Sequence, residues 1–405
     1  MKKSAKAAAL LLPLMLVAAA CGSDDESTTA TEAPAVTEAP VDSGAPATEA
    51  PSGDAEGLAR AQAIVDAAAA PPENIVPTVP LTGVPEKKVV AWLECEQPSC
   101  AAIRPGFEAA TEALGWELLT IPAGSFAQGP GVQQAIDAGA DYIAHTGSPL
   151  ATAEAEIAAA KEAGIPYLSC YATDDPDFAT NNLLMQCGDD AGVFATGALI
   201  SNWVIVDSAA AANVLIVNIP DFPVLVSEVE GANSAYTENC SACKVSELNV
   251  TIDQLIAGEV PGAVASAIQA DDTINYIQFT FGDLPAGVAD TLEESGLLEG
   301  RKIVGVDFSA AIGLPEIIAG RHSAWTSNPK VYAAWLMVDA MARHAVGMDN
   351  PDERANALLP TFIVSDAAGA QTMLDLGPDG WPGPATMSDQ FKALWGGLSH
   401  SAPSK

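Results

Sequence analysis

The residues best suited to chemistry are cysteines. Six of the seven cysteines fall in local pairs along the chain. These pairs are Cys95 with Cys100, Cys170 with Cys187, and Cys240 with Cys243. Paired thiols of this kind can hold zinc, exchange electrons or form structural disulfides, and the compartment in which the protein resides decides among these roles.

Zinc and redox chemistry are the alternatives to structural disulfides. A zinc site takes four ligands at finger-like spacing, whereas the four histidines, His145, His322, His344 and His400, are scattered through the chain. Cys240-x-x-Cys243 has the spacing of a thioredoxin-type motif, but it follows no first strand and lacks a neighbouring Trp and Pro. In an oxidising compartment we therefore expect three disulfides, no metal site and no cofactor, with Cys95–Cys100 shaping a loop.

The amino terminus indicates export. Residues 1–20 place three lysines before an apolar stretch that is too short to span a bilayer, which is typical of a secretory signal peptide. Cys21 follows three alanines and precedes Gly22, a pattern that resembles the lipobox of bacterial lipoproteins. Because Ala18 stands where Leu is commoner, a plain secreted protein is the alternative. We expect Cys21 to be lipidated and to anchor the chain to the outer face of the cell membrane.

The charge balance narrows the possible partners. Lys and Arg total 17 against 52 Asp and Glu. This excess of negative charge argues against nucleic acid and against anionic lipid as binding partners. An acid-rich solubilising surface explains it, and a cationic ligand is the sharper alternative.

The first part of the mature chain has little to bury. Residues 21–53 contain the tetrapeptide TEAP three times among Ser, Thr, Ala and Gly, which predicts a disordered tether behind the lipidated cysteine. Residues 54–86 then predict a leader helix, which Pro71 and Pro72 close, and an extended segment. The tether separates the membrane anchor from the folded part.

From Lys87 onward, short β-rich runs alternate with amphipathic helical patterns. The predicted strands are 87–93, 116–121, 141–145, 165–170, 182–187, 213–219, 244–250, 275–281, 301–307 and 323–327. Such alternation predicts right-handed βαβ units, with parallel sheets covered by helices on both faces. The globular part exceeds what one core usually serves, so we expect an α/β fold of two lobes.

Several ordered blocks resemble one family, the type I periplasmic solute-binding proteins, which are ribose-binding-like receptors of ABC importers. The blocks include KKVVAWLECEQPSCAAIRPGFEAATEALGWEL from Lys87, QQAIDAGADYIAHTG from Gln133, and GRKIVGVDFSAAIGLPEIIAGRHSAWTSNPKVYAAWLMVDAMARHAVG from Gly300. The resemblance covers residues 54–397. The cysteine pair after the first strand and SDQFKALWGG from Ser388 are similar to an actinobacterial branch of this family.

The resemblance implies two flavodoxin-like lobes that hinge on three crossovers and hold a small-molecule solute between them. Lobe I would comprise 87–189 plus 328–359, lobe II 190–327 plus 360–375, and 376–405 would form a C-terminal extension. The crossovers would lie near Asp189-Asp190, Ser327-Asn328 and Pro360–Val364. An ABC permease would be the partner of a monomeric protein, and a sensor kinase is the alternative.

Open parallel sheets bind ligands beyond the carboxyl ends of their strands, which selects candidate ligand-binding residues. Those at strand ends are Glu94, Glu96, Gln97, His145 with Thr146, Tyr171, Asp189, Phe281, Asp283 and Asp307. Among aromatic residues, Tyr171, Phe222, Phe281 and Trp325 could stack on an apolar ring face, with core packing as the alternative.

The family pattern transfers unevenly to these positions. Asp307 matches the Asp of the family's VGxD, which accepts hydrogen bonds from sugar hydroxyls, and a helix cap is its alternative role. Gly282 replaces an Asn that contacts sugar, and Cys170-Tyr171 stand where sugar binders carry Asp-Arg. A sugar or sugar-like solute is the expectation, and amino acids, polyamines or other cations are the alternative. The sequence carries no Gly-x-Ser-x-Gly, His-Glu-x-x-His or phosphate-loop signature, so we expect no enzyme.

Overall fold

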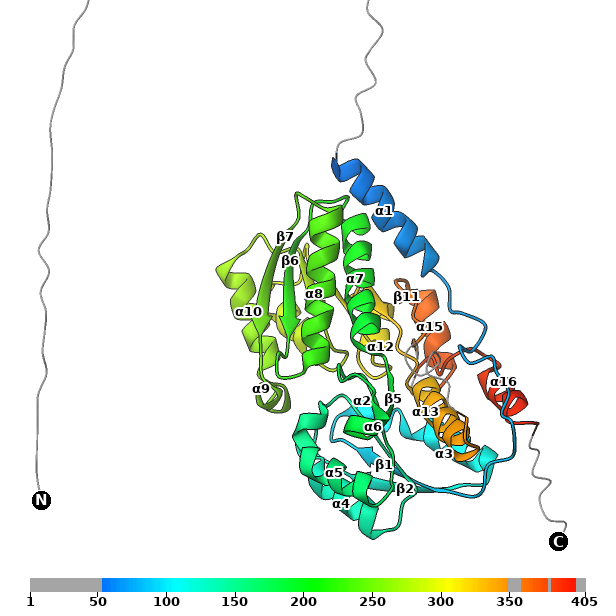
Figure 1. Cartoon of the computed structure of the whole chain (residues 1–405). Helices are drawn as coiled ribbons and strands as arrows, with labels where there is room; N and C mark the ends of the chain where they lie inside the picture. Colours follow the sequence, from blue (N-terminus) through cyan, green and yellow to red (C-terminus); the bar gives the residue numbers. More distant parts are fainter. Residues whose placement is uncertain (1–52, 349–357, 378–379, 398–405) are drawn as a thin grey trace, which may run out of the picture. The chain divides into compact units, whose positions relative to one another are not determined.

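Two sheets organise the chain. The computed structural model describes residues 53–348, 358–377 and 380–397 (Figure 1). The first sheet has five parallel strands in the order β2-β1-β3-β4-β5. Its strands are β1 (Val89–Glu94), β2 (Glu117–Pro122), β3 (Tyr142–Thr146), β4 (Tyr167–Cys170) and β5 (Leu183–Cys187). We call this sheet and the helices packed on it lobe I.

The second sheet has six strands in the order β11-β10-β9-β8-β6-β7 and defines lobe II. Its strands are β6 (Asn213–Asn218), β7 (Lys244–Asn249), β8 (Tyr276–Phe279), β9 (Lys302–Gly305), β10 (Ala324–Thr326) and β11 (Ile363–Val364). All pairs are parallel except β10 with β11. The predicted α/β fold with parallel sheets is confirmed. The sequence missed β11, because two residues are too few to show a period.

Lobe I is built around large aromatic residues. Its helices are α2 (Pro98–Ala101), α3 (Arg104–Leu114), α4 (Gly129–Asp137), η1 (Leu150–Ala153), α5 (Glu154–Glu162), α6 (Phe178–Asn181), α13 (Lys330–Ala345) and α16 (Met387–Leu394). Trp92 of β1 stacks on Phe107 of α3 with ring centroids 4.8 Å apart. Trp335 of α13 stacks on Trp395, which follows α16, at 5.4 Å. The return helix α13 therefore joins the core of the first sheet, although it follows β6 to β10 of the second.

Lobe II carries the remaining helices. They are α1 (Gly53–Ala67), α7 (Asp190–Asp207), α8 (Pro223–Asn239), α9 (Ile252–Ile256), α10 (Val260–Ala270), α11 (Val288–Glu294), α12 (Gly313–Ile318) and α15 (Ala367–Asp375). Figure 1 shows α7 and α8 side by side, with the leader helix α1 next to them. Ala61 of α1 is fully buried in the cluster that these helices form on the sheet.

The chain passes between the sheets where strands end. After β5, Gly188 adopts a left-handed backbone with φ 54°, and Asp189 caps α7 by accepting a hydrogen bond of 3.0 Å from the amide of Gly192. After β10, Pro329 precedes the first residue of α13, so the strand cannot continue. A third passage leads from Leu358 to β11. The hinge motion and the exact lobe boundaries stay predictions.

The three predicted disulfides join the expected cysteines. Cys95–Cys100 closes the loop between β1 and α2, and Cys170–Cys187 links the ends of β4 and β5. Among the described residues, no group of three or more His, Cys, Asp or Glu side chains is placed to hold a metal ion. Residues 1–52, which include the signal peptide, Cys21 and the tether of the sequence prediction, lie outside the described residues, as do 398–405 of the predicted extension.

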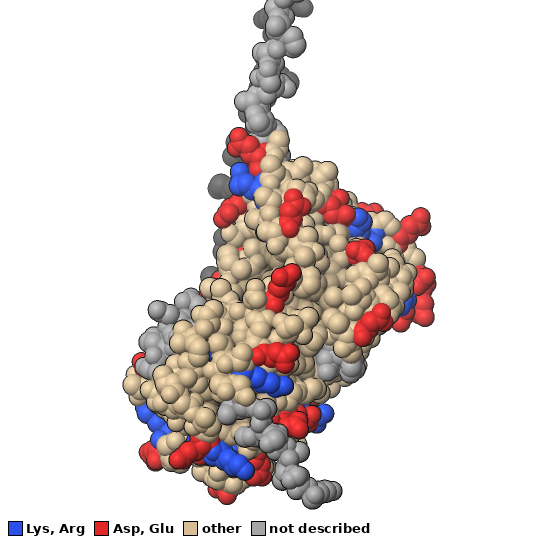
Figure 2. Space-filling view, turned by 90° about the vertical axis from the view of Figure 1, so that its right-hand side faces the viewer, with Lys and Arg blue, Asp and Glu red and all other residues tan. Residues whose placement is uncertain are grey.

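Carboxylates are dispersed over the surface. Figure 2 shows one face, on which Asp and Glu are scattered among uncharged residues, some of them beside Lys or Arg. This distribution fits a solubilising surface, because separated like charges repel weakly in water. Within the described part of the chain, no helix is both long enough and apolar enough to cross a bilayer.

Gly197 of α7 and Gly231 of α8 let the backbones of these two helices touch. This close contact can be tested by substitution. A Cβ at Gly231 would lie 2.0 Å from the carbonyl oxygen of Phe194. We expect Gly231→Ala to lower the free energy of unfolding in urea by about 1–3 kcal/mol or more, because neither backbone can yield. The control is Gly262→Ala in α10, where nothing lies within 4 Å, and there we expect a gain of up to about 1 kcal/mol. Equal effects at both positions would contradict the close packing.

Candidate functional site

A cavity of about 100 Å³ lies between the carboxyl ends of the two sheets, with room for several water molecules. Lobe I contributes residues that follow β1, β2, β3 and β4, and lobe II contributes residues that follow β6, β7, β8 and β9. The lining residues discussed below are Gln97, Ser99, Ile103, Thr146, Tyr171, Phe222, Leu225, Glu228, Ile252, Thr280, Phe281, Asp307, Asn328 and Lys330. Both lobes therefore face the same enclosed space.

Apolar side chains form much of the wall. Ile103 of α3 comes from lobe I, and Leu225 of α8 and Ile252 of α9 come from lobe II. Phe222 lines the cavity and also contacts Phe126 across the gap, with ring centroids 4.6 Å apart. Because Phe126 follows β2 and Phe222 follows β6, this pair joins the two lobes beside the cavity.

Asp307 and Lys330 form a buried ion pair in the cavity wall. Nζ of Lys330 donates to Oδ1 of Asp307, and each residue is only 8% exposed. Asp307 follows β9, whereas Lys330 begins α13, so the pair ties the second sheet to the helix that returns to lobe I. Asp307 has a left-handed backbone with φ 60°, a conformation that a non-glycine residue keeps only when its surroundings fix it.

Gly282 explains one departure from the family pattern. A Cβ at this position would lie 2.0 Å from the carbonyl oxygen of Asp307. The loop after β8 therefore touches the loop after β9 backbone to backbone. An Asn at position 282 would push Asp307 out of place, so the sugar-contacting Asn of the family does not fit this chain.

Tyr171 connects the end of β4 to the second crossover. Its hydroxyl donates to Oδ1 of Asn328, and its amide donates to the carbonyl oxygen of Cys187 at 2.8 Å. The backbone φ is 56°. Burial, reinforced by the charge of Asp307, holds the pKa of the Tyr171 hydroxyl well above its ordinary value, so the group stays neutral.

Glu228 of α8 is the other charged residue in the wall. It is 6% exposed, and its Oε2 has no hydrogen-bond partner among the described residues. Burial first, and the charge of Asp307 second, raise the pKa of the Glu228 carboxyl well above its ordinary value. Glu228 also lines a second, smaller cavity that extends toward Gly188 and Pro360 at the crossovers.

The first loop presents one predicted side chain to the cavity and turns two away. Gln97 lines the cavity, and so do the two cysteines of the Cys95–Cys100 disulfide. Glu94 instead pairs with Arg104 at 3.5 Å, and Glu96 accepts hydrogen bonds from the amide and hydroxyl of Ser125 at 3.0 and 2.9 Å. Both glutamates thus hold the loop in place and are not among the lining residues, and their role in ligand binding stays a prediction.

Three more predicted residues lie outside the wall. Asp189 caps α7, as described above. His145 is fully buried with no hydrogen-bond partner on either ring nitrogen among the described residues, and its neighbour Thr146 lines the cavity instead. Asp283 is 5% exposed, and burial raises its pKa although Lys330 and hydrogen bonds from Ser99 lower it. Asp283 therefore reaches across to lobe I through Ser99, which does line the cavity.

Trp325 lies in the core of lobe II and not among the lining residues, which favours core packing, the alternative role, while ligand binding stays a prediction. It is fully buried in β10, and its indole Nε1 donates to Nδ1 of His322 at 3.1 Å. Tyr171, Phe222, Phe281 and Asp307 do line the cavity, together with Gln97. The sequence missed Glu228 and Lys330, because a charged residue inside a helical pattern usually faces solvent and gave no signal of burial.

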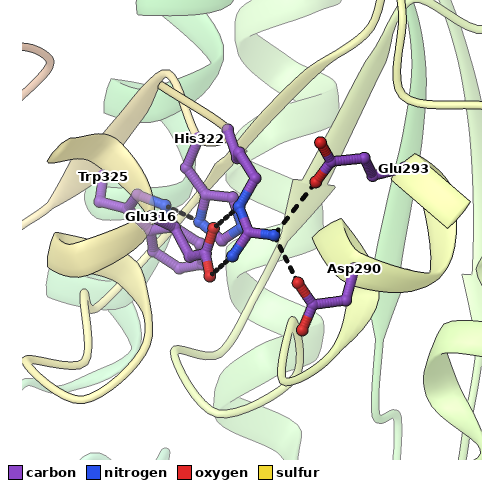
Figure 3. A network of polar contacts seen from close by, with 6 residues as sticks. Asp290, Glu293, Glu316, His322 and Trp325 are labelled. Carbon is purple, nitrogen blue, oxygen red and sulfur yellow. Dashed lines mark hydrogen bonds and ion pairs between the residues drawn. The ribbon is translucent and has the colours of Figure 1, made fainter. Parts of the chain in front are cut away.

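Beside Trp325, one arginine of lobe II pairs with three acidic side chains (Figure 3). Arg321 holds Glu316 through two hydrogen bonds of 2.6 Å. It also contacts Asp290 and Glu293 of α11, the latter at 3.3 Å. The three carboxylates, Glu316 first, raise the pKa of Arg321 above its ordinary value. Arg321 precedes β10, so this network lies at the end of the sheet opposite the cavity and has a structural role.

The fold and the cavity define a two-lobed α/β binding protein, and comparison with known proteins agrees. Residues 95–349 match the family model described as periplasmic binding protein domain, so the chain belongs to this family. Its proteins bind solutes outside the cytoplasm and are not enzymes. No curated protein matches the sequence.

Solved structures share the fold at low identity. A solute-binding protein of an ABC transporter from Mycobacterium smegmatis, with bound glycerol, is 19% identical over 73% of this chain and 99% of its own, with a TM-score of 0.62. A 5-methylthioribose transporter solute-binding protein from Thermotoga lettingae is 17% identical over 79% and 100%, with a TM-score of 0.62. A carbohydrate transporter from Acidothermus cellulolyticus, in complex with myo-inositol, is 19% identical over 72% and 99%, at 0.59.

The buried histidines make the fold sensitive to acid. Burial lowers the pKa of His145 to about 3, and burial with the nearby charge of Arg321 lowers that of His322 to about 3. Unfolded histidine titrates near 6.5, so both side chains stabilise the fold fully above that pH and lose this contribution as pH falls from 6.5 toward 3.

We expect urea melts of His322→Gln to show a weaker pH dependence between pH 6 and 4 than the wild type. The difference in slope should approach about 1.4 kcal/mol per pH unit, which is the value for one proton. Gln keeps an acceptor for Trp325, so the fold should survive. Identical slopes in the two proteins would mean that His322 is already protonated in the folded state.

Proposed function

We propose that this chain is an extracytoplasmic solute-binding lipoprotein, which captures a small polar solute between its lobes and delivers it to an ABC import permease. The observation that carries the proposal is the cavity, because residues of both sheets line it at their carboxyl ends. A solute held there contacts both lobes at once. Presentation to a sensor kinase would use the same capture step, and a gene for a permease beside this one would favour transport.

Capture would work by a shift in populations. A solute that contacts both lobes only when the cleft is shut favours the shut form by the difference in its affinity for the two forms. The crossovers at Gly188, Asn328 and Pro360 surround the smaller cavity, so the chain can change direction there without disturbing either sheet. The permease would recognise the shut form.

The solute is expected to be small and sugar-like in size. The glycerol, 5-methylthioribose and myo-inositol of the three related structures support this expectation. In this chain, Gln97, Thr280 and Asn328 offer neutral hydrogen-bonding groups in the wall, and Asp307 offers a carboxylate. A ring with one apolar face would suit Phe222 and Phe281.

Ligand capture is testable by melting and by small-angle scattering of the mature chain against pentoses, polyols, amino acids and amines. We expect one solute class to raise the free energy of unfolding by about 2.7 kcal/mol at a hundred times its dissociation constant. The same class should reduce the radius of gyration, because the lobes close. Asp307→Asn should remove most of the shift, since Asn tolerates the left-handed backbone but loses the charge.

Asp272→Ala serves as the control, because Asp272 is exposed and lies after α10. It should respond to the solute like the wild type. A chain that neither melts later nor contracts with any compound would contradict the proposed function. If Asp307→Asn responds in full, the role given to Asp307 is wrong and the proposed capture stands.

Membrane attachment is tested separately through Cys21. We expect Cys21→Ser to move the exported protein from the membrane fraction to the medium or periplasm, because one thioether-linked lipid group would be lost. Ser4→Ala, in the predicted signal peptide, should leave the protein in the membrane. Release of the wild type into the medium or periplasm, with no lipid mass at its amino terminus, would contradict lipidation and favour a plain secreted protein.

A further inference from the structure

Glu228 has no counter-charge of its own in the cavity. Among the described residues that line the cavity, the only other Asp, Glu, Lys, Arg or His side chains are Asp307 and Lys330, and these two neutralise each other. The ionised carboxylate of Glu228 would therefore leave the enclosed space with one net negative charge. Burial of such a charge without a partner is costly.

Glu228 cannot easily move away from this position. A Cβ at Gly197 of α7 would lie 2.1 Å from the carbonyl oxygen of Glu228, so the backbone of α8 rests directly against α7 at this residue. Its neighbour Ser227 donates a hydrogen bond to Asp190 at the start of α7. The helix pair thus holds the Glu228 carboxyl against the cavity, with its Oε2 unpartnered.

The rest of the wall suits a cation. Phe222, Phe281 and Tyr171 supply aromatic rings, whose faces attract ammonium groups. The described residues of the wall include no arginine, so Lys330 is the one cation among them that could compete for the carboxylate. The cavity can therefore accept one positive charge from a ligand. The like charge in the described wall belongs to Lys330, which is already paired with Asp307.

We propose that the solute of this cavity carries a protonated amine, which binds the carboxylate of Glu228. This inference rests on the proposed solute capture and specifies the class of solute. A hydroxyl can donate a hydrogen bond to Glu228, but it leaves the buried charge uncompensated. An ammonium group donates a hydrogen bond to the carboxylate and also compensates its charge.

The amine and a proton then compete for Glu228. The groups that face this carboxyl are Asp307, Lys330 and Tyr171 in the cavity, and Asp190 at the start of α7 lies next to Ser227. Burial and the charge of Asp307 raise the pKa of Glu228 in the empty protein, so a proton competes with an ammonium solute for this carboxyl. The affinity for the amine should therefore rise up to about tenfold per pH unit while Glu228 is protonated in the empty form, and that for a neutral analogue should not.

The test uses probes in pairs that differ by one ammonium group in place of a hydroxyl. Suitable pairs are glucosamine with glucose, 3-amino-1,2-propanediol with glycerol, and cyclohexylamine with cyclohexanol. Calorimetry on the full mature protein should show that the amine of at least one pair binds at least tenfold more tightly than its partner. Glu228→Gln should abolish this advantage and the pH dependence, while its melting temperature does not fall, because Gln is neutral and close to Glu in size.

The matched control is Glu230→Gln, which makes the same change two residues further along α8 at an exposed position. It should keep the preference for the amine. If neutral members bind as well as the amines, or if the preference survives in Glu228→Gln, the inference is wrong and the proposed capture stands. If no member of any pair binds, the preference for an amine and the proposed solute capture are both rejected.

Discussion

The buried ion pair between Asp307 and Lys330 is the constraint on which the rest of the cleft depends. Two charges this deeply enclosed are tolerated only as a well-formed pair, because removal of either leaves the other without compensation. The pair fixes the end of β9 against the start of α13, and through α13 it reaches the core of the other sheet. It also explains the left-handed backbone of Asp307 and the need for glycine at position 282.

Once this pair is in place, the remaining groups of the cavity have distinct roles. Asp307 is occupied by Lys330, so its carboxylate is only partly available to a solute. Tyr171 is neutral, and its hydroxyl donates a hydrogen bond to Asn328. It therefore forms part of the cavity wall and does not act as an acid. Among the described residues of the cavity wall, Glu228 alone has a buried side-chain oxygen without a hydrogen-bond partner, which is why we propose that it sets the charge of the preferred solute. Phe222 and Ile252 contribute apolar surface to the wall, and the lower local dielectric constant beside it strengthens electrostatic interactions with a solute.

The sequence predicted most of the architecture and about half of the candidate site. Alternating β-rich runs and amphipathic segments predicted the sheets, and local cysteine pairs predicted the disulfides, because both signals are short in range. Strand ends located Tyr171, Phe281 and Asp307 correctly in the cavity wall. The same rule did not bring the side chains of Glu94 and Glu96 into the wall, because a strand end fixes where a residue lies but not which neighbour its side chain contacts. The rule could not find Glu228 either, since its burial arises only when α8 packs on α7.

Apart from the Asp307–Lys330 pair, two contacts that join the lobes around the cavity are individually weak, and this bears on how a solute could control them. Phe126 with Phe222 is a pair of the kind worth about 0.5–1.5 kcal/mol, and Phe126 is partly exposed. Ser99 interacts with the carboxyl of Asp283. Hydrogen bonding from Ser99 lowers the pKa of this carboxyl, whereas its burial raises it and so disfavours the charged acceptor. In the proposed capture, contacts of this size would let a solute shift the balance between open and shut forms. A solute that adds one charge-assisted hydrogen bond to Glu228 contributes an energy of the same order, about 1.5–3 kcal/mol, so a single group on the ligand is enough to decide which form prevails.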